Sequence, residues 1–209
     1  MYLSSNSLGF FADPDDITNS PLQMFGEVAP GDLKYKDQNG DGIIDSNDAI
    51  EIGNSSPRVS YGLNILLKHK NLSLFAFGYG WNGYDGYLSS SYFWVQGNNK
   101  YSEEVLNRWT PETAATATYP RLSSKNSPNN FQGSTFWLQE MDFFRLDRIQ
   151  LTYDLPKNLS QKLACKNISL FLRGDNLVLL SKVDATKRQL NPGGAPAYRN
   201  YGIGARIEF

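Results

Sequence analysis

This sequence of 209 residues has one cysteine, one histidine, almost no net charge and no long apolar run. Cys165 is the single cysteine, which excludes a disulfide within the chain, and we expect it to be a small buried apolar residue. His69, the single histidine, lies in a short polar turn, Lys68–Asn71, and has no second histidine with which to share a metal ion. Because the sequence contains no Ser/His/Asp or Cys/His set, we expect no enzyme.

The formal net charge is −1, from 20 basic and 21 acidic residues. This balance gives no indication of binding to nucleic acid or to anionic lipid. No run of about 18 apolar residues is present, so no transmembrane helix is predicted. A membrane protein is not excluded, because barrel strands alternate and leave a weak hydropathy signal. Met1–Ser5 shows no charged region followed by an apolar stretch, so no signal peptide is predicted.

Aromatic residues and glycine are abundant instead. The chain has 12 Tyr, 12 Phe, 4 Trp and 18 Gly, in short runs where apolar and small polar residues alternate. This pattern is typical of β-structure. The clearest predicted strand is residues 58–68, whose apolar face holds Val59, Tyr61, Leu63, Ile65 and Leu67. The other predicted strands are residues 33–36, 72–81, 141–155, 167–178 and 198–209.

One of these runs has a defect. Phe144 and Leu146 have one parity in the run 141–155, whereas Ile149, Leu151 and Tyr153 have the other. One extra residue in a β-bulge at Asp147-Arg148 would bring all five apolar side chains onto one face.

Three features favour a membrane barrel over a soluble β-sandwich, which also alternates. The runs are long enough to cross a bilayer when tilted. Their connections alternate between short (68–71, 156–166) and long (96–138, 181–196), as periplasmic turns and extracellular loops do. The last run keeps an apolar residue at every second position from Tyr201 to Phe209. The predicted fold class is therefore all-β, an antiparallel transmembrane β-barrel segment with long extracellular loops.

The stretch 37–48 reads as a twelve-residue calcium loop. Oxygen ligands are expected from loop positions 1, 3, 5, 7, 9 and 12, with a glycine at position 6 for the sharp turn. Those positions hold Asp37, Asn39, Asp41, Ile43 (through its carbonyl), Asp45 and Asp48, with Gly42 at the turn. Asp48 departs from the usual Glu, and Ile44 is expected to pin the loop to its support. The alternative is a turn made by Asn-Gly and Asp-Gly with solvated carboxylates and no ion.

No helix is expected on either side of the loop, which separates it from an EF-hand. The preceding residues 30–36 are short and β-like, and the residues after Ala49 lead into an alternating run. The loop is therefore predicted to be a calcium-stapled connection between β elements, not a calcium sensor.

Three tryptophans lie in or beside the long connection 96–138: Trp94, Trp109 and Trp137. We consider them candidates for stacking on sugar rings of a substrate. The alternative is that they pack the loops on one another. The same connection holds one predicted helix, Glu103–Trp109, with Ser102 as its cap and with Val105, Leu106 and Trp109 on its buried side.

Several separated motifs resemble SusC/RagA-type TonB-dependent transporters. They include Pro30-Gly-Asp-Leu-Lys-Tyr-Lys-Asp-Gln-Asn-Gly-Asp-Gly-Ile-Ile-Asp45, Pro57-Arg-Val-Ser-Tyr-Gly62, Asn107-Arg-Trp-Thr-Pro111, Tyr119-Pro-Arg121, Tyr153-Asp-Leu-Pro156 and Leu172-Arg-Gly-Asp-Asn-Leu177. The chain is similar to the C-terminal barrel segment of that family over nearly its whole length.

The resemblance implies an outer-membrane barrel of about 22 strands that is filled by a plug domain, energised through TonB and covered by a SusD-like surface lipoprotein. Its substrates would be glycans or peptides. Five or six strands cannot close such a barrel, so the expected partners include the remainder of the barrel and the plug, the SusD-like lipoprotein and outer-membrane lipid. TonB would act only through the missing part.

The predicted arrangement has two parts. Residues 1–57 form an extracellular connection with the calcium loop, and residues 58–209 form C-terminal strands and extracellular loops of one larger barrel domain. The C-terminus would be periplasmic. The predicted function is to complete the barrel wall of a nutrient importer and to supply loops that face the substrate and the lid. The alternative is a secreted, calcium-stapled β-sandwich that acts as a binding module.

Overall fold

The computed structural model describes residues 1–98, 102–188 and 198–209, which fall into two compact units. The loop unit contains Met1–Ser56, Tyr84–Glu140 and the described residues from Val183 to 188. The sheet unit contains Pro57–Gly83, Met141–Lys182 and the described residues from 198 onward. The chain therefore passes between the units several times. The predicted division into an extracellular connection, 1–57, and the strands and loops of 58–209 stays a prediction.

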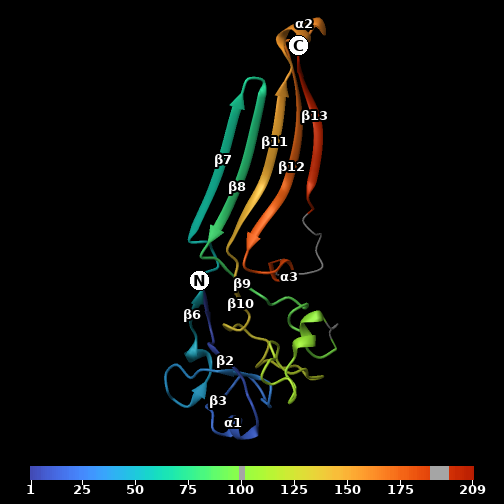
Figure 1. Ribbon diagram of the computed structural model, residues 1–209. Helices are drawn as coiled ribbons and strands as arrows, with labels where there is room; N and C mark the ends of the chain where they lie inside the picture. The colour runs from blue at the N-terminus through green and yellow to red at the C-terminus, as the bar shows by residue number, and fades with distance from the viewer. Residues whose placement is uncertain (99–101, 189–197) are drawn as a thin grey trace. The chain divides into compact units, whose positions relative to one another are not determined.

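The sheet unit is one antiparallel sheet of five strands (Figure 1), in the order β13-β12-β11-β8-β7. The strands are β7 (Val59–His69), β8 (Leu72–Asn82), β11 (Phe143–Asp154), β12 (Asn167–Ser181) and β13 (Asn200–Glu208). Each was predicted from alternation, and β12 continues three residues beyond the expected end at 178. The order leaves β7 and β13 as the two edges of the sheet.

The predicted bulge is present in β11. Its pairing with β8 and its pairing with β12 both shift between Leu146 and Arg148. Leu146 lies opposite Gly78, and Arg148 lies opposite Phe77, so Asp147 is the extra residue against β8. The insertion restores the phase of the apolar side chains on either side of it.

The two faces of the sheet differ in chemistry, because directly paired residues point to the same side. One face, called the apolar face here, carries aliphatic and aromatic residues from all five strands. Its members include Val59, Tyr61, Leu63, Ile65, Leu67, Leu74, Phe144, Leu146, Ile149, Leu151, Tyr153, Leu170, Leu172, Tyr201, Ile203 and Ile207. The opposite face mixes aromatic residues of β8 with arginines and small polar residues.

The apolar face is open. Leu67 is 60% exposed and Ile203 is 84% exposed, values that a core position would not have. Among the described residues, the sheet unit contains no second sheet that packs against this face. A surface of this size and composition requires an apolar partner.

The short connections lie at one end of the sheet. The β7–β8 turn, the connection with helix α2 (Lys157–Lys162) and the last described residue, Phe209, are all found there (Figure 1). Cys165, which follows α2, is 9% exposed, as expected for a buried thiol. No helix in the described part of the chain is long and apolar enough to cross a membrane.

The loop unit is built from short elements joined by irregular chain. They are β1 (Tyr2–Ser4), β2 (Ser7–Phe10), α1 (Pro14–Thr18), β3 (Leu22–Gln23), β4 (Leu33–Tyr35), β5 (Ile43–Ile44), η1 (Ser46–Asp48), β6 (Ile50–Gly53), β9 (Asp85–Tyr87), η2 (Glu103–Asn107), β10 (Leu138–Glu140) and α3 (Ala185–Arg188). The pairs β1-β6, β2-β4 and β10-β9 are antiparallel, and β3-β5 is parallel. Most of these strands are too short for a period to show in the sequence, and only β4 was predicted.

The helix predicted at 103–109 is a shorter 3-10 helix, η2, and Ser102 makes no side-chain capping hydrogen bond. Val105 is buried, as predicted, but Leu106 is 72% exposed, so its predicted burial is wrong. The reason is the tighter winding of a 3-10 helix, which changes the residues that share a face.

Candidate metal loop, aromatic cluster and lipid-facing sheet

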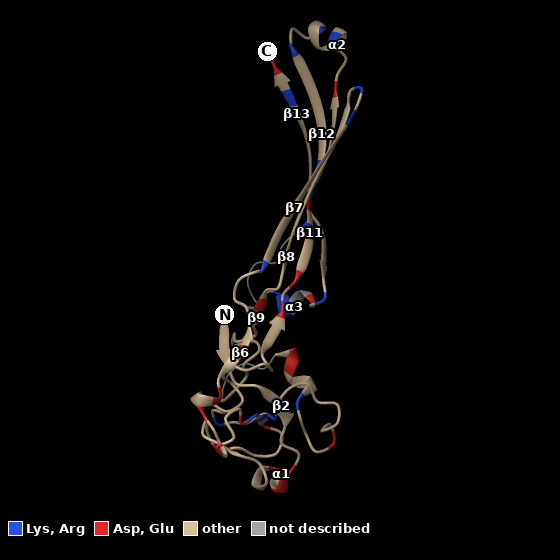
Figure 2. Ribbon diagram, turned by 90° about the vertical axis from the view of Figure 1, so that its left-hand side faces the viewer, with Lys and Arg blue, Asp and Glu red and all other residues tan. Residues whose placement is uncertain are grey.

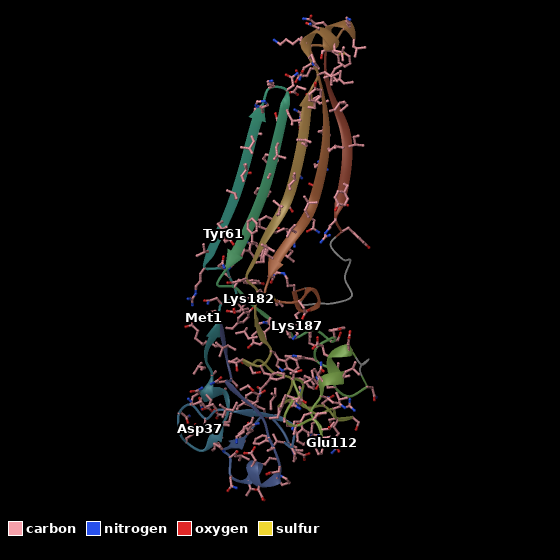
Figure 3. The ribbon with its side chains drawn as sticks, viewed as in Figure 1. Met1, Asp37, Tyr61, Glu112, Lys182 and Lys187 are labelled. Carbon is pink, nitrogen blue, oxygen red and sulfur yellow. The ribbon has the colours of Figure 1, made fainter. Side chains whose placement is uncertain are left out.

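The 37–48 loop is held by hydrogen bonds between its own side chains and backbone. The carboxylate of Asp37 (labelled in Figure 3) accepts from the N–H of Gly40 at 2.6 Å and from the N–H of Gly42 at 2.8 Å. Both glycines have positive φ, 78° and 82°, where a side chain would be strained. The expected sharp turn is therefore present at Gly42.

Asp48 closes the loop from inside. Its carboxylate is fully buried and accepts from the N–H groups of Gln38 (2.7 Å), Asn39 (3.4 Å) and Asp45 (2.9 Å). These backbone donors, the Asp45 N–H first, hold the pKa of Asp48 below its usual range. One side chain thus ties the beginning of the loop to its end.

The loop contains all six predicted calcium ligands: Asp37, Asn39, Asp41, Ile43, Asp45 and Asp48. Among the described residues, however, no three His, Cys, Asp or Glu side chains are gathered so that they could hold one ion. The hydrogen bonds do not exhaust the carboxylates, since each oxygen has a second lone pair. The all-oxygen donor set suits a hard cation, and calcium binding stays a prediction.

Ile44 attaches the loop to the core, as expected. It is 1% exposed and forms the buried cluster of the loop unit with Leu33 and Tyr35. Phe10, Phe25 and Phe136 pack around this cluster. The loop is therefore fixed at its centre by apolar contact, independently of any ion.

A buried ion pair joins distant segments of the loop unit. The carboxylate of Asp32 lies 2.8 Å from Nε of Arg121, and its second oxygen accepts from the other guanidinium nitrogen at 2.9 Å. It also accepts from the side-chain amide of Asn130 (2.7 Å) and from the N–H of Ala29 (2.8 Å). The Asp32 side chain is 1% exposed. A bidentate pair of this kind sets the geometry of both segments.

A second set of buried polar contacts lies beside it. The amide nitrogen of Gln23 donates to the carbonyl of Leu33 (3.0 Å) and to the side-chain oxygen of Asn129 (2.6 Å). The Tyr35 hydroxyl donates to the carbonyl of Asn129 at 2.7 Å, and burial raises the pKa of this hydroxyl. The sequence pattern missed this network, because Asn129 and Asn130 stand in a stretch with loop composition.

An aromatic cluster fills the other part of the loop unit. Trp137 is 3% exposed, and its indole N–H donates to the carbonyl of Asn130 at 2.7 Å. The rings in contact with Trp137 are Trp94, Tyr119, Phe131 and Phe136, with centroids 4.8 to 6.2 Å away. Trp137 is therefore a core residue, which corresponds to the packing alternative.

Tyr119 is fixed in the same cluster. Its hydroxyl donates to the carbonyl of Phe93 (2.7 Å) and accepts from the N–H of Val95 (3.1 Å). Burial raises its pKa to about 12. The Tyr119 hydroxyl thus holds the backbone of residues 93–95 against the aromatic cluster.

The other two candidate tryptophans are half-buried. Trp109 packs so closely on Gly31 (φ 87°) that a side chain at Gly31 would collide with its ring. Trp94 contacts Phe131 and Trp137. Stacking of Trp94 and Trp109 on a substrate stays a prediction.

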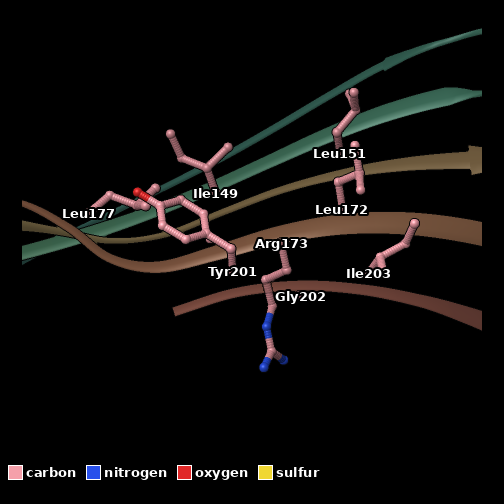
Figure 4. Close-up of a pocket in the computed structure, with 9 residues that line it drawn as sticks. Ile149, Leu151, Leu172, Arg173, Leu177, Tyr201, Gly202 and Ile203 are labelled. Atoms are coloured by element: carbon pink, nitrogen blue, oxygen red, sulfur yellow. The ribbon is translucent and has the colours of Figure 1, made fainter. Parts of the chain in front are cut away.

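On the sheet unit, the apolar face includes a shallow open cavity of about 620 Å³. Figure 4 shows Tyr201, Ile203, Leu151 and Leu172 on the side of the sheet that lines it, whereas the Arg173 guanidinium extends to the other side. The cavity lies beside the bulge, where Leu177 crosses over Gly174. Its walls are apolar, as a lipid-exposed surface requires.

Comparison with known proteins gives consistent matches. No family model matches the chain. Two curated proteins of Formosa agariphila do: TonB-dependent receptor P26 is 31% identical over 199 residues, and TonB-dependent receptor P3 is 22% identical over 178 residues. The matches cover 94% and 85% of this chain, but 19% and 17% of those receptors. The chain thus spans about a fifth of the length of its curated relatives.

Solved structures match over the whole chain. The RagAB peptide importer in its open-open state has a TM-score of 0.69 at 19% identity, and the match covers 22% of that chain. A structure of the RagAB peptide transporter has a TM-score of 0.67 at 20% identity, with 23% of that chain covered. At this level of identity, the similarity establishes the fold.

This chain is a barrel segment of the TonB-dependent receptor type, and its fold is that of the matching segment of RagAB. The resemblance drawn from the sequence motifs is confirmed, and so is the all-β, antiparallel barrel fold. Proteins of this type belong to the bacterial outer membrane, and the open apolar face of the sheet fits that location. The relatives are receptors and transporters, in line with the expectation of no enzyme.

Proposed function

We propose that this chain forms part of the barrel wall of an outer-membrane nutrient importer and supplies surface loops that face substrate and lid. The observation that carries the proposal is the five-stranded sheet with an open apolar face and two open edges. Unpaired backbone groups along β7 and β13 would be prohibitively costly in lipid. The edges therefore pair with further strands, which the remainder of the transporter supplies.

The other partners follow from the same assignment. The remainder of the transporter provides the plug and the contact with TonB, and a SusD-like lipoprotein covers the loops. The substrate is a glycan or a peptide. The similarity in fold to the RagAB peptide importer supports a peptide substrate. The half-buried rings of Trp94 and Trp109 support a glycan, since indole rings stack on sugars.

We further propose that the 37–48 loop binds calcium on the extracellular side. Ordered turns at Asp37 and Asp41 and the positive-φ glycines support a loop that turns its oxygens together. The ion would draw the carboxylates of the loop together, neutralise them and cross-link the loop. Asp48 would keep its backbone contacts while it contributes its remaining lone pairs.

The barrel assignment is tested by extraction from native membranes. We expect the chain to remain in the membrane fraction until detergent is added and then to co-purify with the polypeptide that carries the rest of the barrel. A chain that is soluble without detergent, monomeric and cooperative in its melting would support the secreted β-sandwich instead.

The importer assignment is tested by uptake. A strain that lacks this chain should lose uptake of either labelled oligosaccharides or labelled oligopeptides, and restoration of the chain should return it. The class that is lost identifies the substrate. Unchanged uptake of both classes would contradict the importer function and leave the barrel fold untouched.

The calcium proposal is tested by limited proteolysis of the loop. We expect calcium to protect residues 37–48 and a chelator to remove the protection. Asp41→Ala should abolish the effect, whereas Asp15→Ala, which alters an exposed carboxylate of α1, should not. Equal cleavage with calcium and with chelator would reject the ion.

A further inference from the structure

Basic side chains are grouped at the end of the sheet unit that holds the short connections. Five lysines lie in or beside the β7–β8 turn and the connection with α2: Lys68, Lys70, Lys157, Lys162 and Lys166. Neither residues 65–74 nor residues 155–168 contain Asp or Glu. The whole-chain charge of −1 conceals this grouping, which Figure 2 shows at α2 and at the tip of the β7–β8 hairpin.

These five lysines are available to a ligand. All are exposed, and within the described residues none forms an ion pair. The nearest acidic residue at the end of β11, Asp154, accepts a hydrogen bond of 2.6 Å from the Ser169 hydroxyl. The acidic residues described at this end of the strands are Asp154 on β11 and Glu208 on β13, which pairs with Asn167. The five lysines outnumber these two carboxylates, so the patch keeps a net positive charge.

Apolar side chains stand among the lysines. Leu159 of α2 is 49% exposed, and Leu163, the residue directly after α2, is 60% exposed. Ser160, 0% exposed, marks the side of α2 that packs inward. Exposed leucines flanked by lysines are the composition of a segment that lies in a membrane interface.

The patch is continuous with the apolar face. A shallow cavity of about 420 Å³ at the β7–β8 turn is lined by His69, Lys70, Asn71, Leu72 and Tyr153. A second, of about 550 Å³, is lined by Lys157, Gln161, Ala164, Cys165, Lys166 and Phe209. Each cavity places a lysine ammonium beside an apolar surface. That arrangement matches a phosphate group attached to an acyl chain.

We propose that this end of the sheet, through α2 and the β7–β8 turn, docks on anionic phospholipid headgroups. The lysines bind the phosphates, and Leu159 and Leu163 enter the upper part of the acyl layer. The proposal rests on the proposed barrel function, since it requires that the apolar face already lies in lipid. The acyl chains of a zwitterionic lipid accommodate the leucines, but its headgroup does not compensate the excess positive charge. The proposal therefore predicts selectivity for headgroups with a net negative charge.

The selectivity is measured on the transporter extracted with its partner polypeptides. The detergent complex is incubated with phosphatidylglycerol and phosphatidylethanolamine in equal amounts, and the retained lipids are counted by native mass spectrometry at low and high salt. We expect retention of phosphatidylglycerol over phosphatidylethanolamine, and we expect high salt to reduce this preference.

The variant that tests the patch is the triple substitution Lys157→Gln, Lys162→Gln, Lys166→Gln. It should lower the preference by up to about fivefold for each lysine removed. The control, compared per lysine removed, is Lys36→Gln with Lys125→Gln, two exposed lysines of the loop unit. It should leave the preference unchanged. Equal loss in both variants would show a general charge effect and overturn the proposal.

A depth measurement adds a second readout. In a Cys165→Ala background, Leu159→Cys carries an environment-sensitive dye, and the transporter is placed in bilayers that contain lipids with nitroxide-labelled headgroups. We expect strong quenching of the dye at position 159. A dye at Lys125→Cys should not be quenched. A water-exposed, unquenched dye at 159 would overturn the proposal.

The outcomes separate the two proposals. If the chain needs no detergent, the barrel function itself fails. If the chain inserts in the membrane but shows neither preference for phosphatidylglycerol nor quenching at position 159, the docking proposal fails and the barrel function stands.

Discussion

Asp48 shows how one side chain can hold a loop together. Its carboxylate is buried and accepts from three backbone N–H groups. We predict that Asp48→Asn destabilises the loop by on the order of 2 kcal/mol, because an amide N–H₂ would face a backbone donor. The measurement is hydrogen exchange of residues 37–48. Asp15→Asn on α1 should have no effect on this loop.

The same residue predicts a pH dependence. The folded pKa of Asp48 lies below its unfolded value, which is about 3.9. The carboxylate therefore stabilises the fold above that value, and the contribution is lost as pH falls through the folded pKa. The protection of the loop amides from hydrogen exchange, relative to their intrinsic rate at each pH, should decrease below about pH 4. Asp48→Asn should remove this part of the pH profile. A profile identical to that of the unsubstituted chain would contradict the assignment.

The ion pair between Asp32 and Arg121 leads to a prediction about stability. Removing its partner by Arg121→Met leaves a buried carboxylate with reduced compensation, and we expect a loss of about 3–5 kcal/mol. Arg121→Lys keeps the charge but not the bidentate geometry, and its loss of stability should be smaller than that of Arg121→Met. Protease sensitivity of residues 21–35 in the extracted transporter reports the effect. Equal sensitivity of both variants would mean that the retained positive charge contributes nothing without the bidentate geometry.

At the scale of the element, Gly80 of β8 is a place where no side chain fits. A Cβ there would lie 2.5 Å from the Phe143 carbonyl oxygen and 2.5 Å from the Tyr61 ring. The rings of Tyr61 and Phe144, both opposite Gly80, are parallel within 5°, with centroids 6.2 Å apart. Glycine here lets three neighbouring strands approach.

We predict that Gly80→Ala lowers the amount of assembled protein in the outer membrane, with a cost of about 1–3 kcal/mol. Gly62→Ala is the matched control, because its nearest atom would be 3.8 Å away. The shift of the folded band in unheated gels measures assembly. Similar yields for both variants would show that the sheet adjusts to the added methyl group.

The bulge in β11 makes a second prediction at this scale. Deletion of Asp147 removes the extra residue, and a one-residue slip turns half of the apolar side chains of β11 to the polar face. We expect no assembled protein from the deletion, whereas Asp147→Asn, which keeps the length, should assemble normally. Assembly of the deletion variant would mean that the bulge does not determine the register.

At the scale of the molecule, the two faces of the sheet predict opposite tolerance of charge. Leu63 lies at mid-strand on the apolar face, and Asn64 next to it lies on the opposite face. Arginine at a lipid-facing midplane position costs about 2–4 kcal/mol. Leu63→Arg should therefore lower membrane assembly, whereas Asn64→Arg should be tolerated. Full assembly of Leu63→Arg would show that this face does not contact lipid.

The sequence predicted the sheet well and the loops poorly, for a physical reason. An eleven-residue strand with one buried or lipid-covered face repeats its pattern five times, so β7 was visible in the sequence. The bulge at Asp147 was visible for the same reason, as a break in that repeat. The strands β3 and β5 have two residues each and carry no period. Leu106 was misplaced because the sequence did not distinguish a 3-10 helix from an α-helix.

The sequence by itself determined the antiparallel strands, their apolar face, the turn of the 37–48 loop and the resemblance to TonB-dependent transporters, because each depends on local order along the chain. Only the tertiary structure decided that Asp48 turns inward, that Asp32 pairs with Arg121, that Trp137 is buried and that five lysines gather at one end of the sheet. These depend on contacts between segments far apart in sequence, which local order does not record.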